Sequence, residues 1–336
     1  MSNLKLFFCD FFSDFIVEND FFYKLLSRKY KIVLDRQRPD FLIYSCYGHE
    51  FFNYDCPRVF YTAENLRPDF NLCDYAIGFD CLDFGDRYCR FPNFARYGKQ
   101  FEALVKQAPS QKQGLTGKTA FCNFIYSNAF ADPVRDRFFH LLSKYKRVDS
   151  HGKHLNNMPS DSFNHTLGAW AAKVELQRPY KFSIAFENSS APGYTTEKIL
   201  HAFIADTVPI YWGNPLITRE FNPKAFVNCH DFENLEAVVR RVAELDSDDE
   251  QYLAMLNEPC FYGNVIPEAL REETLLNFFT SIFSQPPVAA YRRPRHGTTV
   301  TYEIFLRKAL ELAARKDAFM RLVKSPLRPL KAILKQ

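Results

Sequence analysis

Apolar runs of four to seven residues, separated by short polar segments, recur through the first hundred positions of the chain. Such runs are typical of strands that are buried in a sheet. We expect strands at residues 4–12, 31–35, 40–46, 58–64 and 74–80. Apolar residues at helical spacing over 14–30 predict an amphipathic helix between the first two strands. This alternation predicts a first α/β layer that ends near residue 105.

A polar segment at residues 106–118 has the composition of a linker, and the alternation resumes after it. We expect a strand at 119–127, a helix at about 134–145 and a further helix from about residue 235. The chain therefore divides into two α/β halves and a basic tail. The predicted boundaries are 1–110, 115–290 and 291–336.

The stretch from 181 to 214 carries the densest set of polar residues between two predicted strands. An apolar run ends at Glu187-Asn188, a glycine-containing loop follows, and Glu197-Lys198 opens a helical pattern before a second strand. This is a βαβ unit, and parallel sheets bind ligands beyond the carboxyl ends of their strands. A helix N-terminus favours anions, so Lys198 there suggests a bound phosphate. The alternative is an ordinary strand–helix junction with a solvated Glu-Lys pair.

The spacing of these residues is similar to a known motif. F-x-x-x-F-E-N-S followed by Y-x-T-E-K resembles the donor-binding motif of the α1,3/4-fucosyltransferases of glycosyltransferase family 10, which use GDP-fucose. The matching residues are Phe182, Phe186, Glu187, Asn188, Ser189, Tyr194, Thr196, Glu197 and Lys198. The resemblance extends from about Val59 to about Asp231. It implies the GT-B architecture, in which two Rossmann-like domains face each other across a cleft, with acceptor in the first and GDP-fucose in the second.

Glu64 ends the strand predicted at 58–64 and precedes a proline-containing loop. Relatives carry a similar W/Y-x-x-E segment, then a stretch that reads here from Asn71 to Asp80. The resemblance implies that Glu64 is the catalytic base, which accepts the proton of the acceptor hydroxyl. Relatives often have Gly-Glu or Glu-Ser where this chain has Ala63-Glu64-Asn65. On residue chemistry alone, Glu64 would be an exposed loop acid.

Neutralisation of the donor phosphates is assigned to Arg135 and Lys198. The resemblance places Arg135 just inside a helix that starts after an Asp-Pro pair, and a guanidinium suits phosphate because its donors form a fork. The alternative for Arg135 is a surface ion pair with Asp132 or Asp136, and Arg137 is the second choice for the phosphate.

Contacts to fucose and ribose are assigned to Asn188, Tyr194 and Glu197. A carboxylate beside a diphosphate would be repelled, so Glu197 should bind sugar hydroxyls or balance positive charge on the sugar ring. Its alternative role is compensation of the helix dipole. His151 and His154 lie in a loop that could approach the nucleotide, but we expect them to be core or surface residues.

Composition excludes several other classes of function. The nine cysteines stand singly among 336 residues, without C-x-x-C, which is typical of free thiols in a reducing compartment. The Asp246-Ser247-Asp248 segment resembles a metal-binding D-x-D, but a solvated helix start explains it better. We expect no metal site and no required cofactor, although a divalent cation could stimulate. No signal peptide or long apolar span is evident, so we expect a cytoplasmic protein of the bacterial type.

The tail from residue 291 holds twelve Lys or Arg and three acids, net +9, although the whole chain is only +4. Helical spacing over 303–324 gathers apolar residues near one face: Ile304, Phe305, Ala309, Leu312, Ala313, Phe319 and Leu322. Basic amphipathic helices lie on anionic membranes, so 303–336 could bind the inner face of the cytoplasmic membrane. Packing on the protein body is an equal alternative. We expect no binding of nucleic acid, because the body is acidic.

These features predict an inverting fucosyltransferase that transfers L-fucose from GDP-fucose to GlcNAc (or Glc) in a cell-surface glycan, such as lipopolysaccharide or capsule. The oligosaccharide acceptor and the choice between α1,3 and α1,4 linkage stay open. One alternative is a GT-B enzyme that uses another nucleotide sugar. The other is a non-catalytic, membrane-associated glycan-binding protein.

Overall fold

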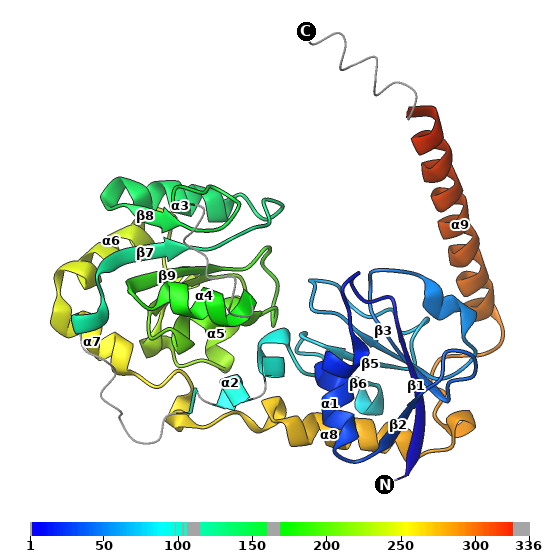
Figure 1. The fold of residues 1–336 in the computed structure, drawn as a ribbon. Helices are drawn as coiled ribbons and strands as arrows, with labels where there is room; N and C mark the ends of the chain where they lie inside the picture. The colour runs from blue at the N-terminus through cyan, green and yellow to red at the C-terminus, as the bar shows by residue number, and fades with distance from the viewer. Residues whose placement is uncertain (1, 98, 103, 106–114, 160–168, 325–336) are drawn as a thin grey trace.

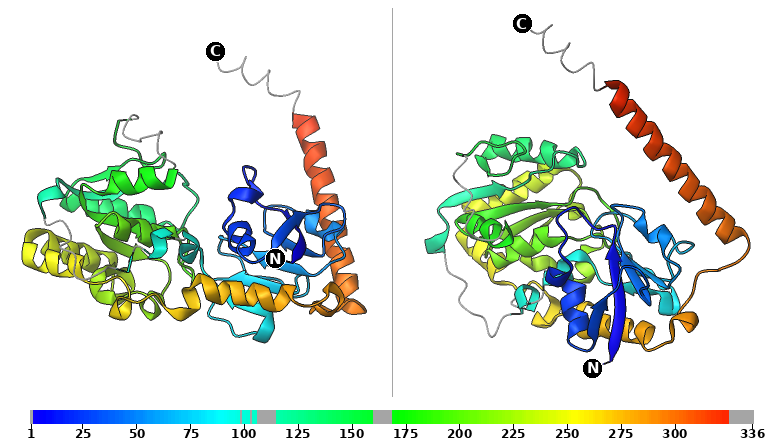
Figure 2. Two further views of the ribbon diagram at one scale, coloured as in Figure 1. Left: turned by 60° about the horizontal axis from the view of Figure 1, so that its bottom comes forward. Right: turned by 45° about the vertical axis from the view of Figure 1, so that its right-hand side comes forward.

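The protein folds into two α/β domains with a long helix leaving the first of them (Figure 1). The structure is a computed structural model, and it describes residues 2–97, 99–102, 104–105, 115–159 and 169–324. Two further views show the same arrangement and place the start of the chain in the first domain (Figure 2). The two-domain α/β fold of the GT-B type that the sequence predicts is confirmed.

The first domain is built on a six-stranded parallel sheet in the order β2-β1-β3-β4-β5-β6. Its strands are β1 (Asn3–Cys9), β2 (Lys31–Leu34), β3 (Phe41–Tyr44), β4 (Arg58–Tyr61), β5 (Tyr75–Gly78) and β6 (Tyr88–Arg90). All of β3 is buried, and its side chains alternate between two apolar clusters. Phe41 and Ile43 belong to one cluster, and Leu42 and Tyr44 belong to the other. Both faces of this sheet are therefore covered.

The helix predicted at 14–30 is shorter in the structure. A 3-10 turn at Val17–Asn19 precedes helix α1, which spans Phe21–Ser27. The carboxylate of Asp20 accepts hydrogen bonds from the N–H groups of Phe22 and Tyr23. Asp20 is thus the N-cap, and the cap fixes the start of the helix after residues that the apolar spacing had included.

The second domain holds a five-stranded parallel sheet in the order β11-β10-β9-β7-β8. The strands are β7 (Ala120–Phe124), β8 (Val148–Ser150), β9 (Tyr180–Phe186), β10 (Val208–Trp212) and β11 (Val227–Asn228). From β7 the chain adds β8 on one side of the sheet and then returns to add β9 on the other side of β7. The strand order therefore reverses between β7 and β9. Open parallel sheets bind ligands at this kind of switch point.

Helices cover both faces of the second sheet. Helices α3 (Val134–Tyr145), α6 (Leu235–Ser247) and α7 (Asp249–Asn257) pack on one face, and α5 (Glu197–Ile204) packs on the other beside α4 (Ala169–Gln177). The side chains of β9 alternate accordingly. Phe182, Ile184 and Phe186 join the cluster with α3 and α6, while Ala185 joins the cluster with α5. The predicted βαβ unit is confirmed as β9-α5-β10.

Helix α8 (Glu272–Phe283) packs on the first sheet, although its residues fall inside the segment that the sequence assigned to the second domain. The ring of Phe279 lies 5.7 Å from that of Phe22, and the ring of Phe283 lies 4.8 Å from that of Phe41. The connections between strands of the first sheet are short and supply little helix of their own. The apolar face of α8 covers the sheet instead, which corrects the boundary predicted at 290.

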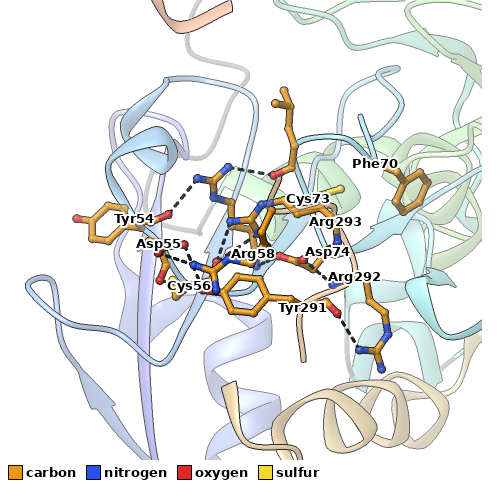
Figure 3. Close-up of polar contacts among 12 residues, drawn as sticks. Tyr54, Asp55, Cys56, Arg58, Phe70, Cys73, Asp74, Tyr291, Arg292 and Arg293 are labelled. Atoms are coloured by element: carbon orange, nitrogen blue, oxygen red, sulfur yellow. Dashed lines mark hydrogen bonds and ion pairs between the residues drawn. The ribbon is translucent and has the colours of Figure 1, made fainter. Parts of the chain in front are cut away.

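Residues 291–295 are fastened to the first domain around the buried carboxylate of Asp74 (Figure 3). This carboxylate accepts backbone hydrogen bonds from Arg58 at 2.8 Å, Arg292 at 2.8 Å and Arg293 at 2.9 Å. It also pairs with the guanidinium of Arg293. Since a buried charge is tolerated only when it is paired and hydrogen-bonded, these contacts hold the chain in place after α8.

Helix α9 (Thr298–Lys324) begins on the first domain and then extends away from it (Figure 1). Leu306 and Leu310 pack against the cluster that lines the sheet, and Glu303 pairs with the buried Arg58 at 2.9 Å. The apolar residues on which the membrane prediction rests are exposed rather than packed on the body: Ile304 by 49%, Phe305 by 69% and Leu312 by 65%. The side chains of Phe319 and Leu322, which belong to the same predicted apolar face, lie outside the described part of the structure. Residues 325–336 also lie outside it.

Two further expectations concern cysteines and membrane spans. All nine cysteines are free thiols, as predicted. Across the helices that the structure describes, none is both long and apolar enough to cross a bilayer.

Candidate active site

A polar pocket lies at the carboxyl ends of β7 and β9, where the strand order reverses. It holds about 760 Å³ of space, including open solvent. The lining residues are Asn123, Ile125, Tyr126, Ser127, Asn128, Lys173, Gln177, Ile184, Asn188, Glu197, Lys198 and His201. The sequence placed Asn188, Glu197 and Lys198 together in a donor site, and the structure brings all three to this pocket. We refer to it as the donor pocket.

Lys198 is held at the start of α5 by a buried carboxylate. Its Nζ lies 3.0 Å from Oε2 of Glu187 and 2.9 Å from Oγ1 of Thr196. Glu187 is fully buried and also accepts hydrogen bonds from the N–H and the hydroxyl of Thr196, both at 2.7 Å. Burial would lower the pKa of Lys198, but the charges of Glu187 and Glu197 outweigh burial and hold it well above its usual range. The ammonium therefore stays charged and fixed in position.

Glu197 is ionised in the pocket and is tied to the first domain. Its Oε2 accepts a hydrogen bond from Nδ2 of Asn93 at 3.0 Å. Burial would raise the pKa of Glu197, but the charge of Lys198 and a backbone hydrogen bond outweigh it and lower the pKa to about 2. An ionised carboxylate accepts hydrogen bonds only, so it can bind sugar hydroxyls but not a phosphate.

Asn93 is the last link of a hydrogen-bonded chain that runs through the first domain. Asp20 pairs with Arg96 at 3.0 Å, and Arg96 donates to the hydroxyl of Tyr61 at 2.6 Å. That hydroxyl lies 3.3 Å from Oδ1 of Asn93, whose amide reaches Glu197. The cap of α1 is thereby connected to the donor pocket of the other domain. We call these five side chains the Asp20–Glu197 relay.

Arg135 lies beneath the donor pocket and does not line it. The side chain has no exposed surface, and its guanidinium stacks 4.4 Å above the ring of Tyr126. It donates to Oδ1 of Asn188 at 3.2 Å and to the carbonyl of Asn128 at 2.6 Å. Arg135 thus supports three residues of the pocket lining, Tyr126, Asn128 and Asn188. Direct contact with a phosphate would require these contacts to open, so that role stays a prediction.

Tyr194 is buried where the two domains meet. Its ring packs edge-on against Phe79 of the first domain, with 5.0 Å between ring centroids. The preceding residue, Gly193, has φ +82°, and a Cβ there would lie 2.3 Å from the carbonyl oxygen of Phe79. Only glycine fits this approach. The loop before α5 is therefore pressed against the first domain, and Tyr194 does not line the donor pocket.

Glu64 lies on the first domain, just after β4, and its side chain is exposed. The hydroxyl of Tyr47 donates to its Oε1 at 2.8 Å. The next residue, Asn65, donates across the domain interface to Oγ of Ser189 at 2.7 Å. Ser189 directly follows Asn188 of the donor pocket. Glu64 thus stands beside the loop that leads into this pocket, as a base acting on the acceptor requires.

Comparison with known proteins agrees with this arrangement. A model described as the α-(1,3)-fucosyltransferase FucT N-terminal domain matches residues 6–97, and one described as the C-terminal part of glycosyltransferase family 10 (fucosyltransferase) matches 115–257. A crystal structure of an α1,3-fucosyltransferase with GDP-fucose is 31% identical with a TM-score of 0.69, and the similarity covers 84% of this chain and 91% of that one. The chain belongs to the family 10 fucosyltransferases.

Curated relatives in this family are longer than the chain. The α-(1,3)-fucosyltransferase FucT of Helicobacter pylori is 34% identical over 278 residues, which are 72% of this chain and 56% of that protein. The human 3-galactosyl-N-acetylglucosaminide 4-α-L-fucosyltransferase FUT3 is 32% identical over 164 residues, 48% of this chain and 42% of that protein. The chain thus spans about half the length of these relatives.

The Asp246-Ser247-Asp248 segment of this family 10 fucosyltransferase starts a helix and pairs with lysines. Asp248 caps α7 through the N–H of Gln251, as expected for a helix start. Asp246 is not solvated, which corrects the prediction, because it pairs with Lys146 at 2.8 Å and with Lys181 at 3.3 Å. In the described residues, no group of three or more His, Cys, Asp or Glu side chains could hold an ion.

His151 and His154, which the sequence placed in a loop that could approach the nucleotide, contact other side chains. His151 lies 2.7 Å from the hydroxyl of Tyr180, and His154 lies 2.8 Å from the carboxylate of Asp136. Neither lines the donor pocket. His201, which sequence reasoning did not single out, does line it. Burial lowers the pKa of His201 to about 4, so its ring is neutral at physiological pH.

Proposed function

We propose that the chain is an inverting α1,3-type fucosyltransferase. It moves L-fucose from GDP-fucose to a hydroxyl of GlcNAc, or Glc, in an N-acetyllactosamine-type glycan. The observation that carries the proposal is the donor pocket at the switch point of the second sheet. There Lys198 and the N-terminus of α5 suit a diphosphate. The likeness to a fucosyltransferase crystallised with GDP-fucose supports the donor, and the N-acetylglucosaminide in the name of the human relative supports GlcNAc as the sugar that receives fucose.

Glu64 is proposed as the base of the transfer. The acceptor oxygen attacks the anomeric carbon of fucose while the bond from that carbon to the β-phosphate oxygen breaks. A single displacement inverts the configuration at this carbon, GDP leaves, and the hydroxyl proton passes to the Glu64 carboxylate. Within the described residues, only Oε1 of Glu64 accepts a hydrogen bond from the protein, from Tyr47, so Oε2 is available for the proton.

Charge that develops on the β-phosphate is neutralised by the ammonium of Lys198, which Glu187 holds in place before the reaction. Asn188 and the ionised Glu197 are assigned to hydroxyls of fucose or ribose. Arg135 and Tyr194 stay assigned to the donor as predictions. Arg135 would act on a phosphate after its present contacts open, and Tyr194 would act from the domain interface.

The experiment is fucosyl transfer by the purified chain from GDP-fucose to N-acetyllactosamine, with product linkage determined by NMR. We expect an α1,3 linkage and GDP release that the acceptor accelerates above slow hydrolysis of GDP-fucose. Since the ammonium of Lys198 and the N-terminus of α5 are assigned to the diphosphate, we also propose that transfer persists in excess chelator. Turnover with another nucleotide sugar but not with GDP-fucose would contradict the proposal, as would binding of glycan without any turnover.

We further propose that the distal part of α9 lies on an anionic membrane, at the cytoplasmic face. The free thiols suit a reducing compartment, and the exposed Phe305 and Leu312 lie in the basic tail of residues 291–336, whose net charge is +9. Vesicles of phosphatidylglycerol should pellet the chain at low salt and release it as salt rises. Binding that is indifferent to salt would contradict an electrostatic contact.

A further inference from the structure

A second pocket lies on the first domain beside the domain interface, and the donor site does not use it. It holds about 830 Å³ of space, including open solvent. Its lining comes from the turn after β1, from the start of α1 and from the 3-10 turn Asn93–Tyr97: Phe12, Asp14, Phe15, Ile16, Asn19, Asp20, Phe21, Asn93, Arg96 and Tyr97. Apolar walls with a few polar groups are typical of small-molecule sites. We call it the aromatic pocket.

The aromatic pocket borders both the donor pocket and the proposed base. On one side it includes Asn93, whose amide donates to Glu197 of the donor pocket. On the other side it includes Phe12, whose ring stands edge-on to Tyr47 with 6.5 Å between centroids. Tyr47 in turn donates to Glu64. A molecule in the aromatic pocket would therefore extend between the group that activates the acceptor and the group that binds the donor sugar.

Polar and charged groups of the aromatic pocket favour a neutral ligand. Its one cation, Arg96, is already paired with Asp20 and donates to Tyr61. A phosphate would meet that pair and the carboxylate of Asp14, so it would be repelled. Asp14 and the amide of Asn19 can instead bind hydroxyl groups.

The exposed ring of Phe12 in the pocket and the ring of Tyr47 beside it suit a carbohydrate. Phe12 is 53% exposed and Tyr47 is 51% exposed, which is high for side chains of this size. Aromatic faces of this kind can cover the apolar C–H face of a pyranose, while nearby polar groups bind its hydroxyls. An aliphatic ligand would leave the hydrogen-bonding capacity of Asp14 and Asn19 unused.

The two exposed rings are held in place before any ligand binds. Asp10, at φ +60°, accepts hydrogen bonds through its carboxylate from the N–H groups of Glu50 at 2.7 Å and Phe51 at 2.9 Å. Its carbonyl accepts from the N–H of Tyr47 at 2.9 Å. The turn that carries Phe12 is thus fastened to the segment that carries Tyr47. A rigid platform loses less entropy on binding.

We propose that the aromatic pocket binds the acceptor saccharide, with Phe12 and Asp14 contacting the sugar unit next to the one that receives fucose. This inference rests on the proposed function and adds residues that set acceptor affinity. It predicts that the effects of a substitution on the two substrates can be separated. Changes at Phe12 or Asp14 alter the use of acceptor and leave the use of GDP-fucose as it is.

The test compares Phe12→Ala and Asp14→Asn with a matched exposed phenylalanine on α9, Phe305→Ala. Phe12→Ala should raise the KM for N-acetyllactosamine by about tenfold, the factor that 1.4 kcal/mol corresponds to. The KM for GDP-fucose and acceptor-free hydrolysis of GDP-fucose should stay unchanged, which also shows that the variant is folded. Phe305→Ala should match the wild type in every measurement.

Saturation-transfer NMR of N-acetyllactosamine with the GDP-loaded protein separates failure of the inference from failure of the proposed function. Binding by the wild type that is lost in Phe12→Ala supports the pocket even without turnover, whereas absent turnover alone contradicts the proposed function. No binding by the wild type overturns the inference. An unchanged acceptor KM in both variants, or an equal rise in the KM for GDP-fucose, also overturns it.

Discussion

Replacing Lys198 by alanine should damage both donor binding and stability, for two separable reasons. A charged hydrogen bond to a phosphate contributes about 1.5–3 kcal/mol, so GDP should bind roughly 10- to 150-fold more weakly. The variant also leaves the fully buried Glu187 without its cation. Removing one partner of a buried pair costs about 3–5 kcal/mol of unfolding free energy. Burial raises the pKa of Glu187, so this destabilisation should shrink as the pH falls and Glu187 takes up a proton.

The double variant Glu187→Gln/Lys198→Ala separates the two effects. It removes the uncompensated charge and keeps an oxygen that can accept from Thr196, so most of the lost stability should return while GDP affinity stays low. Calorimetric titration with GDP and urea unfolding measure the two quantities on the same samples. If the double variant regained GDP affinity, Lys198 would serve only to neutralise Glu187. GDP binding within about twofold of the wild type in Lys198→Ala alone would refute the phosphate role.

Three other outcomes follow from contacts in the structure. Asn93→Ala breaks the Asp20–Glu197 relay at the domain interface and should raise the KM for GDP-fucose several-fold, with the free enzyme still folded by circular dichroism. The neutral form of His201 is favoured, with a pKa of about 4 against its usual 6.5, so the unfolded chain protonates first as pH falls. Stability should drop by about 3 kcal/mol between pH 6.5 and 4, and His201→Gln should remove that part of the slope in urea unfolding. A chain that ends at Tyr302 loses the partner of the buried Arg58 and should unfold about 3–5 kcal/mol more easily, whereas one that ends at Arg315 should not.

Most elements of the fold could be predicted from the local spacing of apolar residues. Five of the six strands of the first sheet, the β9-α5-β10 unit and the bounds of α3 could be predicted because apolar spacing reports burial within one element, whereas the three-residue strand β6 was missed. The covering of the first sheet could not. An amphipathic pattern shows that α8 has an apolar face, but not which of two sheets it covers. For the same reason the pattern in α9 pointed to Phe305 and Leu312, whereas the packed residues are Leu306 and Leu310.

The residues of the donor pocket likewise include some that the sequence could place and others that it could not. Asn188, Glu197 and Lys198 lie within eleven positions of one another on one strand–helix junction, so the sequence could place them together. Glu187 was visible in the motif, but nothing in the sequence showed that its carboxylate is buried beneath Lys198. Asn93 lies 104 positions from Glu197, and its contact arises only from the packing of two domains. The burial of Arg135 under Asn188 is likewise a property of the loop that covers it.

The central claim is that Glu64, on the first domain, takes the proton from an acceptor while the second domain holds the donor. Glu64→Gln tests it most directly, because the substitution keeps the size of the side chain and removes only its basicity. A general base contributes about 10²- to 10⁴-fold, so fucosyl transfer to N-acetyllactosamine should fall by that factor while GDP affinity stays at the wild-type value. Transfer above about a tenth of the wild-type rate, with GDP affinity unchanged, would mean that another group is the base.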